Sequence, residues 1–137
     1  MRAIAIALDA LGDTSAMWRD WLADAERRYR VDVGDLDGQL ANWRTLLQRF
    51  AEERAAVYLR PDSDVSAALR RLHASGARLG VFADAPEELA RVALSQLGAA
   101  RRVELLEAGP GALTRLRAKL GADVEVVQSR SQLLSLT

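Results

Sequence analysis

Two short apolar runs without polar alternation constrain the fold of this sequence more than any other feature. The runs are residues 3–8 and 79–83, and they lead directly into Asp9 and Asp84. A strand in a half-exposed sheet alternates apolar and polar side chains, whereas a strand covered on both faces is apolar throughout. We therefore predict two buried strands of a parallel sheet.

Two stripes of apolar residues at helical spacing lie between these strands and predict a pair of helices. The first stripe consists of Trp18, Leu22, Ala25 and Tyr29. The second stripe consists of Leu36, Leu40, Trp43, Leu47, Phe50 and Val57. The length of the second stripe predicts one continuous helix of about six turns. We interpret the pair as a helical hairpin inserted after the first strand.

Residues that commonly begin and end helices stand on both sides of the second strand. Ser63 is a good N-cap for a helix that Gly76 closes. After the strand, Asp84 and Glu87 form a predicted capping box for a helix that ends at Gly98. The sequence up to this point thus reads strand, hairpin, helix, strand and helix.

The last part of the chain continues the alternation of strands and helices. A short apolar piece at residues 103–106 precedes a predicted helix at 111–120 and a strand at 124–127. This order is typical of a parallel sheet covered by helices. We predict an α/β fold with a Rossmann-like three-layer parallel sheet. Residues 1–137 form a single domain, within which residues 14–58 are a cap-like helical insertion.

The composition excludes several classes of function. The chain has no cysteine and a single histidine, His73, so thiolate metal sites, disulfides and histidine-rich metal sites are excluded. Lysine plus arginine and aspartate plus glutamate number 19 each, which gives no basic domain for nucleic acid. No apolar stretch is long enough to span a membrane. We expect a cytoplasmic protein without nucleic-acid or membrane partners and without a cofactor.

The segment from residue 58 to 98 carries a family resemblance. It contains Arg60-Pro61, a predicted helix, the run 76–82 and then residues 84–88. This segment resembles the one that leads into the second motif of the haloacid dehalogenase-like superfamily of phosphohydrolases. The resemblance continues in the right order over nearly the whole chain. It places the family's site at the carboxyl ends of the strands, where open parallel sheets bind their ligands.

The family's first motif reads Asp-x-Asp-Gly-Thr, and here the corresponding residues run from Asp9 to Thr14. The resemblance places Asp9 at the position of the carboxylate that attacks phosphorus. Leu11 stands where the second carboxylate acts as acid and base, and a leucine can neither give nor take a proton. Asp13 follows Gly12 and has to reach back from a different position in the turn to replace it.

The other three motifs also depart from the family pattern. Ala83 has no hydroxyl where the second motif supplies one, and Gly109-Pro110 lacks the lysine of the third. Gln128 and Gln132 stand at the two acidic positions of the fourth motif, although Mg²⁺ prefers anionic oxygen ligands. Family members continue with another strand and helix after this motif, so we expect a fold shortened at its C-terminus.

These departures imply a noncatalytic pseudoenzyme that acts as a protein-binding or regulatory module. Two alternatives remain open. The first is a residual Mg²⁺-dependent phosphohydrolase that uses Asp9 with Asp13. The second is a sensor that binds phosphoanions or other small molecules at the family's site, in the pocket left empty by the missing catalytic groups. In the simplest interpretation, Asp9 caps backbone amides at the end of its strand, and Asp84 only caps a helix.

A second segment, from Asp35 to Leu40, matches the family's first motif more closely than the loop at Asp9 does. No buried apolar strand precedes it, and it runs straight into the second stripe of the hairpin. We interpret it as a helix start, with Asp35 as the N-cap and Asp37 in the first turn.

All three tryptophans lie in the hairpin, which predicts a second kind of site. The candidate interface residues are Trp18, Trp21, Leu22, Trp43 and Leu47. These side chains can pack on each other and on the sheet, or they can anchor a partner protein or a second copy of the chain. The sequence favours neither possibility over the other.

Overall fold

The computed structural model describes residues 2–121 and 123–136, and within them four parallel strands form one sheet in the order β3-β2-β1-β4. The strands are β1 (Ala3–Ala7), β2 (Arg78–Ala83), β3 (Leu105–Ala108) and β4 (Glu125–Val127). The α-helices are α1 (Ser15–Tyr29), α2 (Leu36–Gln39), α3 (Trp43–Tyr58), α4 (Ser63–Ala74), α5 (Glu87–Gln96), α6 (Ala112–Leu120) and α7 (Arg130–Ser135). The short 3₁₀ helices are η1 (Leu8–Ala10) and η2 (Val33–Asp35). The predicted parallel α/β sheet is confirmed, although β3 begins two residues later than predicted.

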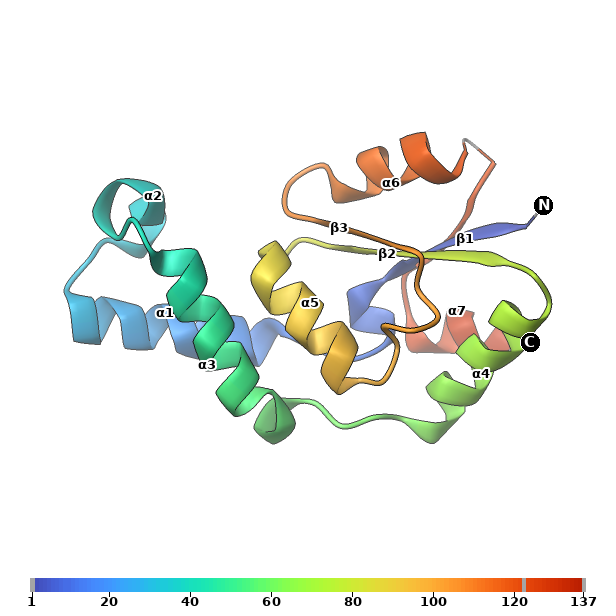
Figure 1. The fold of residues 1–137 in the computed structure, drawn as a ribbon, viewed down its shortest axis with the longest axis horizontal. Helices are drawn as coiled ribbons and strands as arrows, with labels where there is room; N and C mark the ends of the chain where they lie inside the picture. The colour runs from blue at the N-terminus through green and yellow to red at the C-terminus, as the bar shows by residue number, and fades with distance from the viewer. Residues whose placement is uncertain (1, 122, 137) are drawn as a thin grey trace.

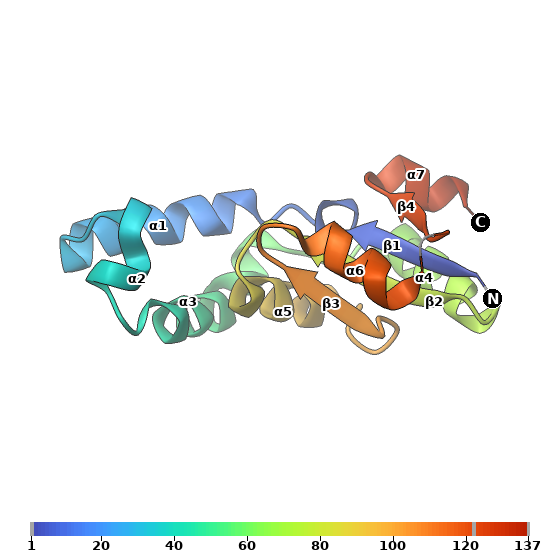
Figure 2. The same cartoon turned by 90° about the horizontal axis from the view of Figure 1, so that it is seen from above.

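Helices cover both faces of the sheet, as predicted for a three-layer fold (Figure 1 and Figure 2). Helix α6 lies on one face, and α4, α5 and α7 lie on the other. The side chains of β1 divide between the two layers because successive residues of a strand point to opposite faces. Ile4 and Ile6 join the larger core, whereas Ala5 packs with Leu116 and Leu120 of α6.

Small residues on the central strands bring α6 close to the sheet. Gly80 of β2 is in register with Ala5 of β1 on this face. A Cβ atom built on Gly80 lies 2.7 Å from Cδ1 of Leu116 and 2.8 Å from Cδ1 of Leu120. A larger side chain at this position therefore requires α6 or its leucines to move.

The helices between β1 and α4 form an insertion that extends from the sheet (Figure 1). Helix α1 packs against α3, and α3 in turn packs against α5. Arg44 of α3 and Glu88 of α5 form an ion pair of 2.9 Å across the second of these contacts. The insertion is therefore attached to the sheet layer through α5.

The predicted six-turn helix is wrong, because the chain breaks between α2 and α3. Leu40 leaves the helical region, with φ −142° and ψ 84°. Local hydrogen bonds stabilise the break: Asp35 accepts one from the N–H of Gly38, and Asp37 accepts one of 2.7 Å from Nε1 of Trp43. The prediction that Asp35 caps a helix is confirmed.

The face that α1 buries also differs from the predicted stripe. Met17, Trp21 and Ala25 are buried, whereas Trp18 is only partly buried and Tyr29 is 37% exposed. On α3 the buried residues are Trp43, Leu47, Ala51 and Ala55. Small alanines form much of these contact faces, because two helices approach closely only where their side chains are small.

Two predicted helix caps are wrong. Helix α4 is capped by Asp62, not by Ser63, because Oδ1 of Asp62 accepts hydrogen bonds from two backbone N–H groups of the first turn. Helix α5 has Pro86 at its N-cap position and no side-chain cap, so the capping box of Asp84 and Glu87 does not form. Asp84 instead follows the end of β2. Among the described residues, no helix is long and apolar enough to cross a membrane.

Candidate functional site

A pocket of about 350 Å³ lies at the carboxyl ends of β1, β2 and β4, where the topology predicts a ligand site. Its polar lining residues are Asp9, Thr14, Ser15, Asp84 and Gln128. The other lining residues are alanines, Leu8, Trp18 and Phe82. The strands thus bring together residues that are far apart in the sequence.

Asp9 lies in η1, directly after β1, and lines this pocket. Partial burial raises the pKa of its carboxyl, and the negative charges of Asp13 and Asp84 raise the pKa further. Within the described residues its side chain forms no hydrogen bond, so the interpretation of Asp9 as a cap for backbone amides is wrong. Its carboxylate is available to a ligand in the pocket.

Neither residue considered for the second carboxylate lines the pocket. The side chain of Leu11 is 5% exposed and belongs to the hydrophobic core. Asp13 is oriented by α1, because its Oδ1 accepts a hydrogen bond of 2.8 Å from the N–H of Ser15. Hydrogen bonds from Ser15 lower the pKa of Asp13, so this carboxyl holds its proton weakly.

Sequence reasoning gave the side chains of Asp84 and Thr14 no role in the pocket. Asp84 was interpreted as a helix cap, but it lines the pocket from the end of β2. Thr14 precedes α1 and lines the pocket although the residue is only 5% exposed. The position of Asp84 directly after a buried strand was the signal that could have identified it.

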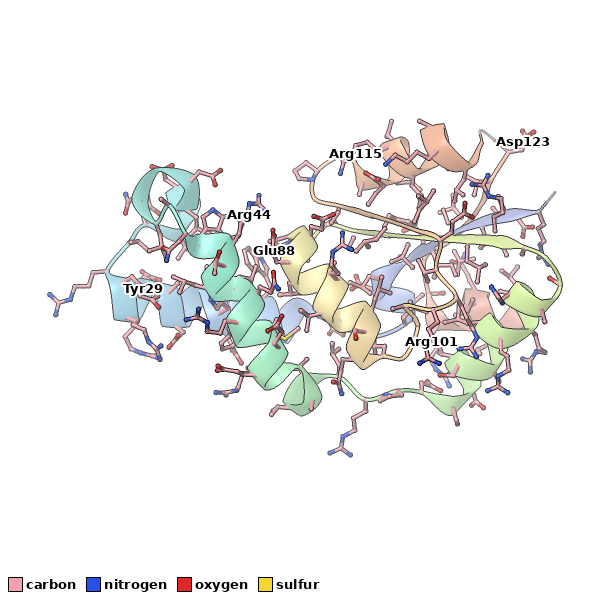
Figure 3. All side chains as sticks on the ribbon, viewed as in Figure 1. Tyr29, Arg44, Glu88, Arg101, Arg115 and Asp123 are labelled. Carbon is pink, nitrogen blue, oxygen red and sulfur yellow. The ribbon has the colours of Figure 1, made fainter. Side chains whose placement is uncertain are left out.

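The segments that resemble the third and fourth motifs are held by local hydrogen bonds. The guanidinium of Arg115, labelled in Figure 3, donates to the backbone oxygens of Ala108 and Pro110. Oε1 of Gln132 accepts a hydrogen bond of 2.7 Å from the N–H of Gln128. Of these residues only Gln128 lines the pocket.

The charge of the pocket determines what it can bind. Among the residues that the structure describes, its two ionisable lining residues are Asp9 and Asp84, and no lysine, arginine or histidine lines it. No group of three or more histidine, aspartate or glutamate residues that could hold a metal ion exists within the described part of the chain. The lining therefore repels phosphate and offers few of the ligands that Mg²⁺ prefers.

The candidate interface residues of the insertion form an aromatic cluster inside the chain. The ring centroids of Trp18, Trp21 and Trp43 lie 5.7 to 6.4 Å apart, and the rings of Trp18 and Trp21 are stacked. Trp21, Trp43 and Leu47 are buried in the core, whereas Trp18 and Leu22 are partly exposed. Intramolecular packing thus accounts for three of the five predicted interface residues.

A groove of about 450 Å³ runs between α1 and α3. Its lining contains aromatic residues, four arginines and three carboxylates: Trp21, Tyr29, Phe50, Tyr58, Arg27, Arg28, Arg49, Arg54, Asp20, Asp24 and Glu53. The hydroxyl of Tyr58 donates a hydrogen bond of 2.6 Å to Asp20 of α1 and so joins the two helices at one end of the groove. Sequence reasoning considered the tryptophans and missed this groove.

No protein-family model matches the sequence, and no curated protein matches it. A solved structure with a similar fold is described as "Crystal structure of putative beta-phosphoglucomutase from Thermotoga maritima". The two structures superpose with a TM-score of 0.59 at 14% sequence identity, and the match covers 99% of this chain and 81% of the other. This likeness shows the fold alone. It supports the predicted α/β fold, in which a parallel sheet carries a helical insertion after its first strand.

Proposed function

We propose that this protein is a noncatalytic member of the haloacid dehalogenase-like fold class that acts as a protein-binding module. The observation that carries the first half of the proposal is the burial of Leu11. The acid/base position holds a side chain that lies in the hydrophobic core, and Asp13 is hydrogen-bonded to Ser15. Neither position 11 nor Asp13 therefore offers Asp9 a carboxylate inside the pocket that could protonate a leaving group.

The charge of the pocket supports the same proposal. Phosphoryl transfer depends mostly on positioning the phosphate and neutralising its developing charge. The two carboxylates Asp9 and Asp84 and the absence of a basic lining residue oppose both. Loss of a single stabilising donor can lower a rate by roughly 100- to 1,000-fold, so little acceleration remains here.

A phosphatase assay tests the noncatalytic proposal. We expect hydrolysis of p-nitrophenyl phosphate with Mg²⁺ to be equal for the wild-type protein and for Asp9→Asn. Residual phosphohydrolase activity predicts Mg²⁺-dependent turnover that the substitution abolishes. Such turnover contradicts the proposal, provided that circular dichroism shows both proteins to be folded.

The groove between α1 and α3 supports the second half of the proposal. Tyrosine, tryptophan and arginine are the residues that most often anchor protein partners, and the groove exposes tyrosine and arginine side chains. Two of its arginines, Arg27 and Arg28, already share Asp24 as an ion-pair partner, whereas Arg49 has no salt bridge among the described residues. We propose that the groove binds a protein segment with apolar and acidic side chains, either of another protein or of a second copy.

Surface variants of the groove test this binding role. Affinity capture from the native cells and mass measurement of the purified protein provide the two readouts. We expect Tyr29→Ala with Arg49→Glu to remove the captured partner or to separate the oligomer. Val57→Glu is the matched control, because Val57 is 72% exposed on α3 and does not line the groove. Loss of binding in the control alone, or in neither variant, contradicts the proposal.

A further inference from the structure

The pocket at the ends of the strands carries an inference that goes beyond the proposed function. Every formal charge that the described residues place on its lining is negative, because Asp9 and Asp84 are the only ionisable residues among them that line it. Two aromatic residues, Trp18 and Phe82, also contribute to the lining. Carboxylates together with aromatic rings are the surroundings in which proteins bind organic cations.

Thr14 provides an independent sign of a ligand. The residue is 5% exposed and lines the pocket, and its hydroxyl has no hydrogen-bond partner among the described residues. No side-chain oxygen or nitrogen in the described part is both sealed from solvent and without a partner. The Thr14 hydroxyl is therefore not sealed from solvent. Because Thr14 lines the pocket, the hydroxyl is accessible from the pocket. A hydroxyl that faces the pocket and has no partner among the described residues is available to hydrogen-bond a ligand atom there.

We propose that this pocket binds a small organic cation with a primary ammonium group. The ammonium carries three N–H donors and one positive charge. Asp9 and Asp84 supply the countercharge, and the hydroxyl of Thr14 and the side-chain oxygen of Gln128 supply neutral acceptors. The volume of about 350 Å³ is at the lower end of the range for small-molecule sites. An alkyl chain of a few carbons can pack against Trp18 and Phe82.

The same lining distinguishes this ligand class from two others. A phosphoanion meets two carboxylates and no cation, so its binding is opposed by like charge. A divalent metal ion lacks a third carboxylate or imidazole ligand among the described residues. The assignment does not depend on the protein-binding groove, because the groove and the pocket have no lining residue in common. Helix α1 contributes different residues to each of them.

Titration with 1,5-diaminopentane tests the proposal, with 1,5-pentanediol as the neutral analogue and glutarate as the anionic one. Amide shifts in ¹H,¹⁵N NMR spectra report where each probe binds. We expect saturable shifts centred on Thr14, Asp84 and Gln128 with the diamine and none with the diol or glutarate. Binding of the diol as tightly as the diamine, or shifts centred outside the pocket, overturns the proposal.

Variants of the pocket provide the second arm of the test. We expect Asp84→Asn to weaken diamine binding by about tenfold or more, because it removes a charged acceptor. Asp123→Asn is the control, since this exposed carboxylate does not line the pocket. If Asp84→Asn does not fold, Thr14→Val takes its place, with a smaller loss of affinity expected. Equal affinities of the folded pocket variant and the control overturn the proposal, as does binding of Mg²⁺ at the pocket without binding of the diamine.

Discussion

Asp13 accepts a hydrogen bond of 2.8 Å from the backbone N–H of Ser15, the first residue of α1. The N–H groups of a first helical turn have no partner within the helix, so this contact satisfies one of them. It also fixes the carboxylate at the start of the insertion, away from the lining of the strand-end pocket. The residue that the motif offered as a substitute acid thus has a structural role instead.

Replacing Asp13 by alanine is expected to lower the free energy of unfolding by about 1 kcal/mol at neutral pH, as for other lost caps. The pKa of Asp13 is lowered in the folded state, so its contribution is present at neutral pH and is lost as the pH falls through that lowered pKa. Urea unfolding at neutral and strongly acidic pH measures both effects. Asp13→Asn keeps an acceptor oxygen and should lose less. A difference from wild type that persists undiminished in acid contradicts this account.

Asp9 has the opposite effect on stability. Burial and two neighbouring carboxylates raise the pKa of its carboxyl, so the folded protein binds this proton more tightly than the unfolded chain does. Stability therefore decreases as the pH rises from the unfolded pKa through the raised value. We expect Asp9→Asn to raise the melting temperature at neutral pH and to leave it unchanged in acid. The gain should be no more than about 1 kcal/mol, because solvent screens this partly exposed group. Asp123→Asn, which changes an exposed carboxylate away from the pocket, should have no such effect.

Restoring the family's second carboxylate at position 11 is expected to destabilise the fold without producing activity. Leu11 is 5% exposed within the core, so Leu11→Asp places an ionisable group among apolar side chains. The cost should be several kcal/mol. Leu11→Met, which conserves volume, should cost less than about 1.5 kcal/mol. Urea unfolding and the phosphatase assay give the two readouts, and a stable Leu11→Asp protein with Mg²⁺-dependent turnover contradicts this reasoning.

The sheet could be predicted because the apolar runs of β1 and β2 are short, continuous and followed by aspartates. The insertion was less predictable, since hydrophobic periodicity identifies which residues are apolar but not how deeply each one is buried. The stripe through Leu36, Leu40 and Trp43 continues across a break that the hydrogen bond from Trp43 to Asp37 helps to hold. That contact joins two separate helices, and one-dimensional periodicity does not encode it.

The strand-end site was predictable in position and only partly in composition. Asp9 was expected at the end of the first strand, and the structure places it in the pocket. Asp84 was misassigned because the spacing from Asp84 to Glu87 matches a capping box, whereas α5 begins only at Glu87, with Pro86 at its N-cap. Thr14 was included only as the last residue of the first motif, since the burial of its side chain depends on how α1 leaves the sheet. Sequence spacing thus located the pocket, and three-dimensional packing decided which side chains line it.

The close approach of α6 to the sheet gives a prediction for Gly80. Gly80→Ala brings a methyl group within 2.7 Å of Leu116 and 2.8 Å of Leu120, so we expect a loss of about 1 to 3 kcal/mol from overpacking. Leu116→Ala alone should cost about 2 to 5 kcal/mol through the cavity it leaves. In the double variant the new methyl group occupies part of that cavity, so the combined loss should be smaller than the sum of the two. Urea unfolding of the four proteins measures this coupling, and strictly additive losses would show that α6 does not rest on the face of Gly80.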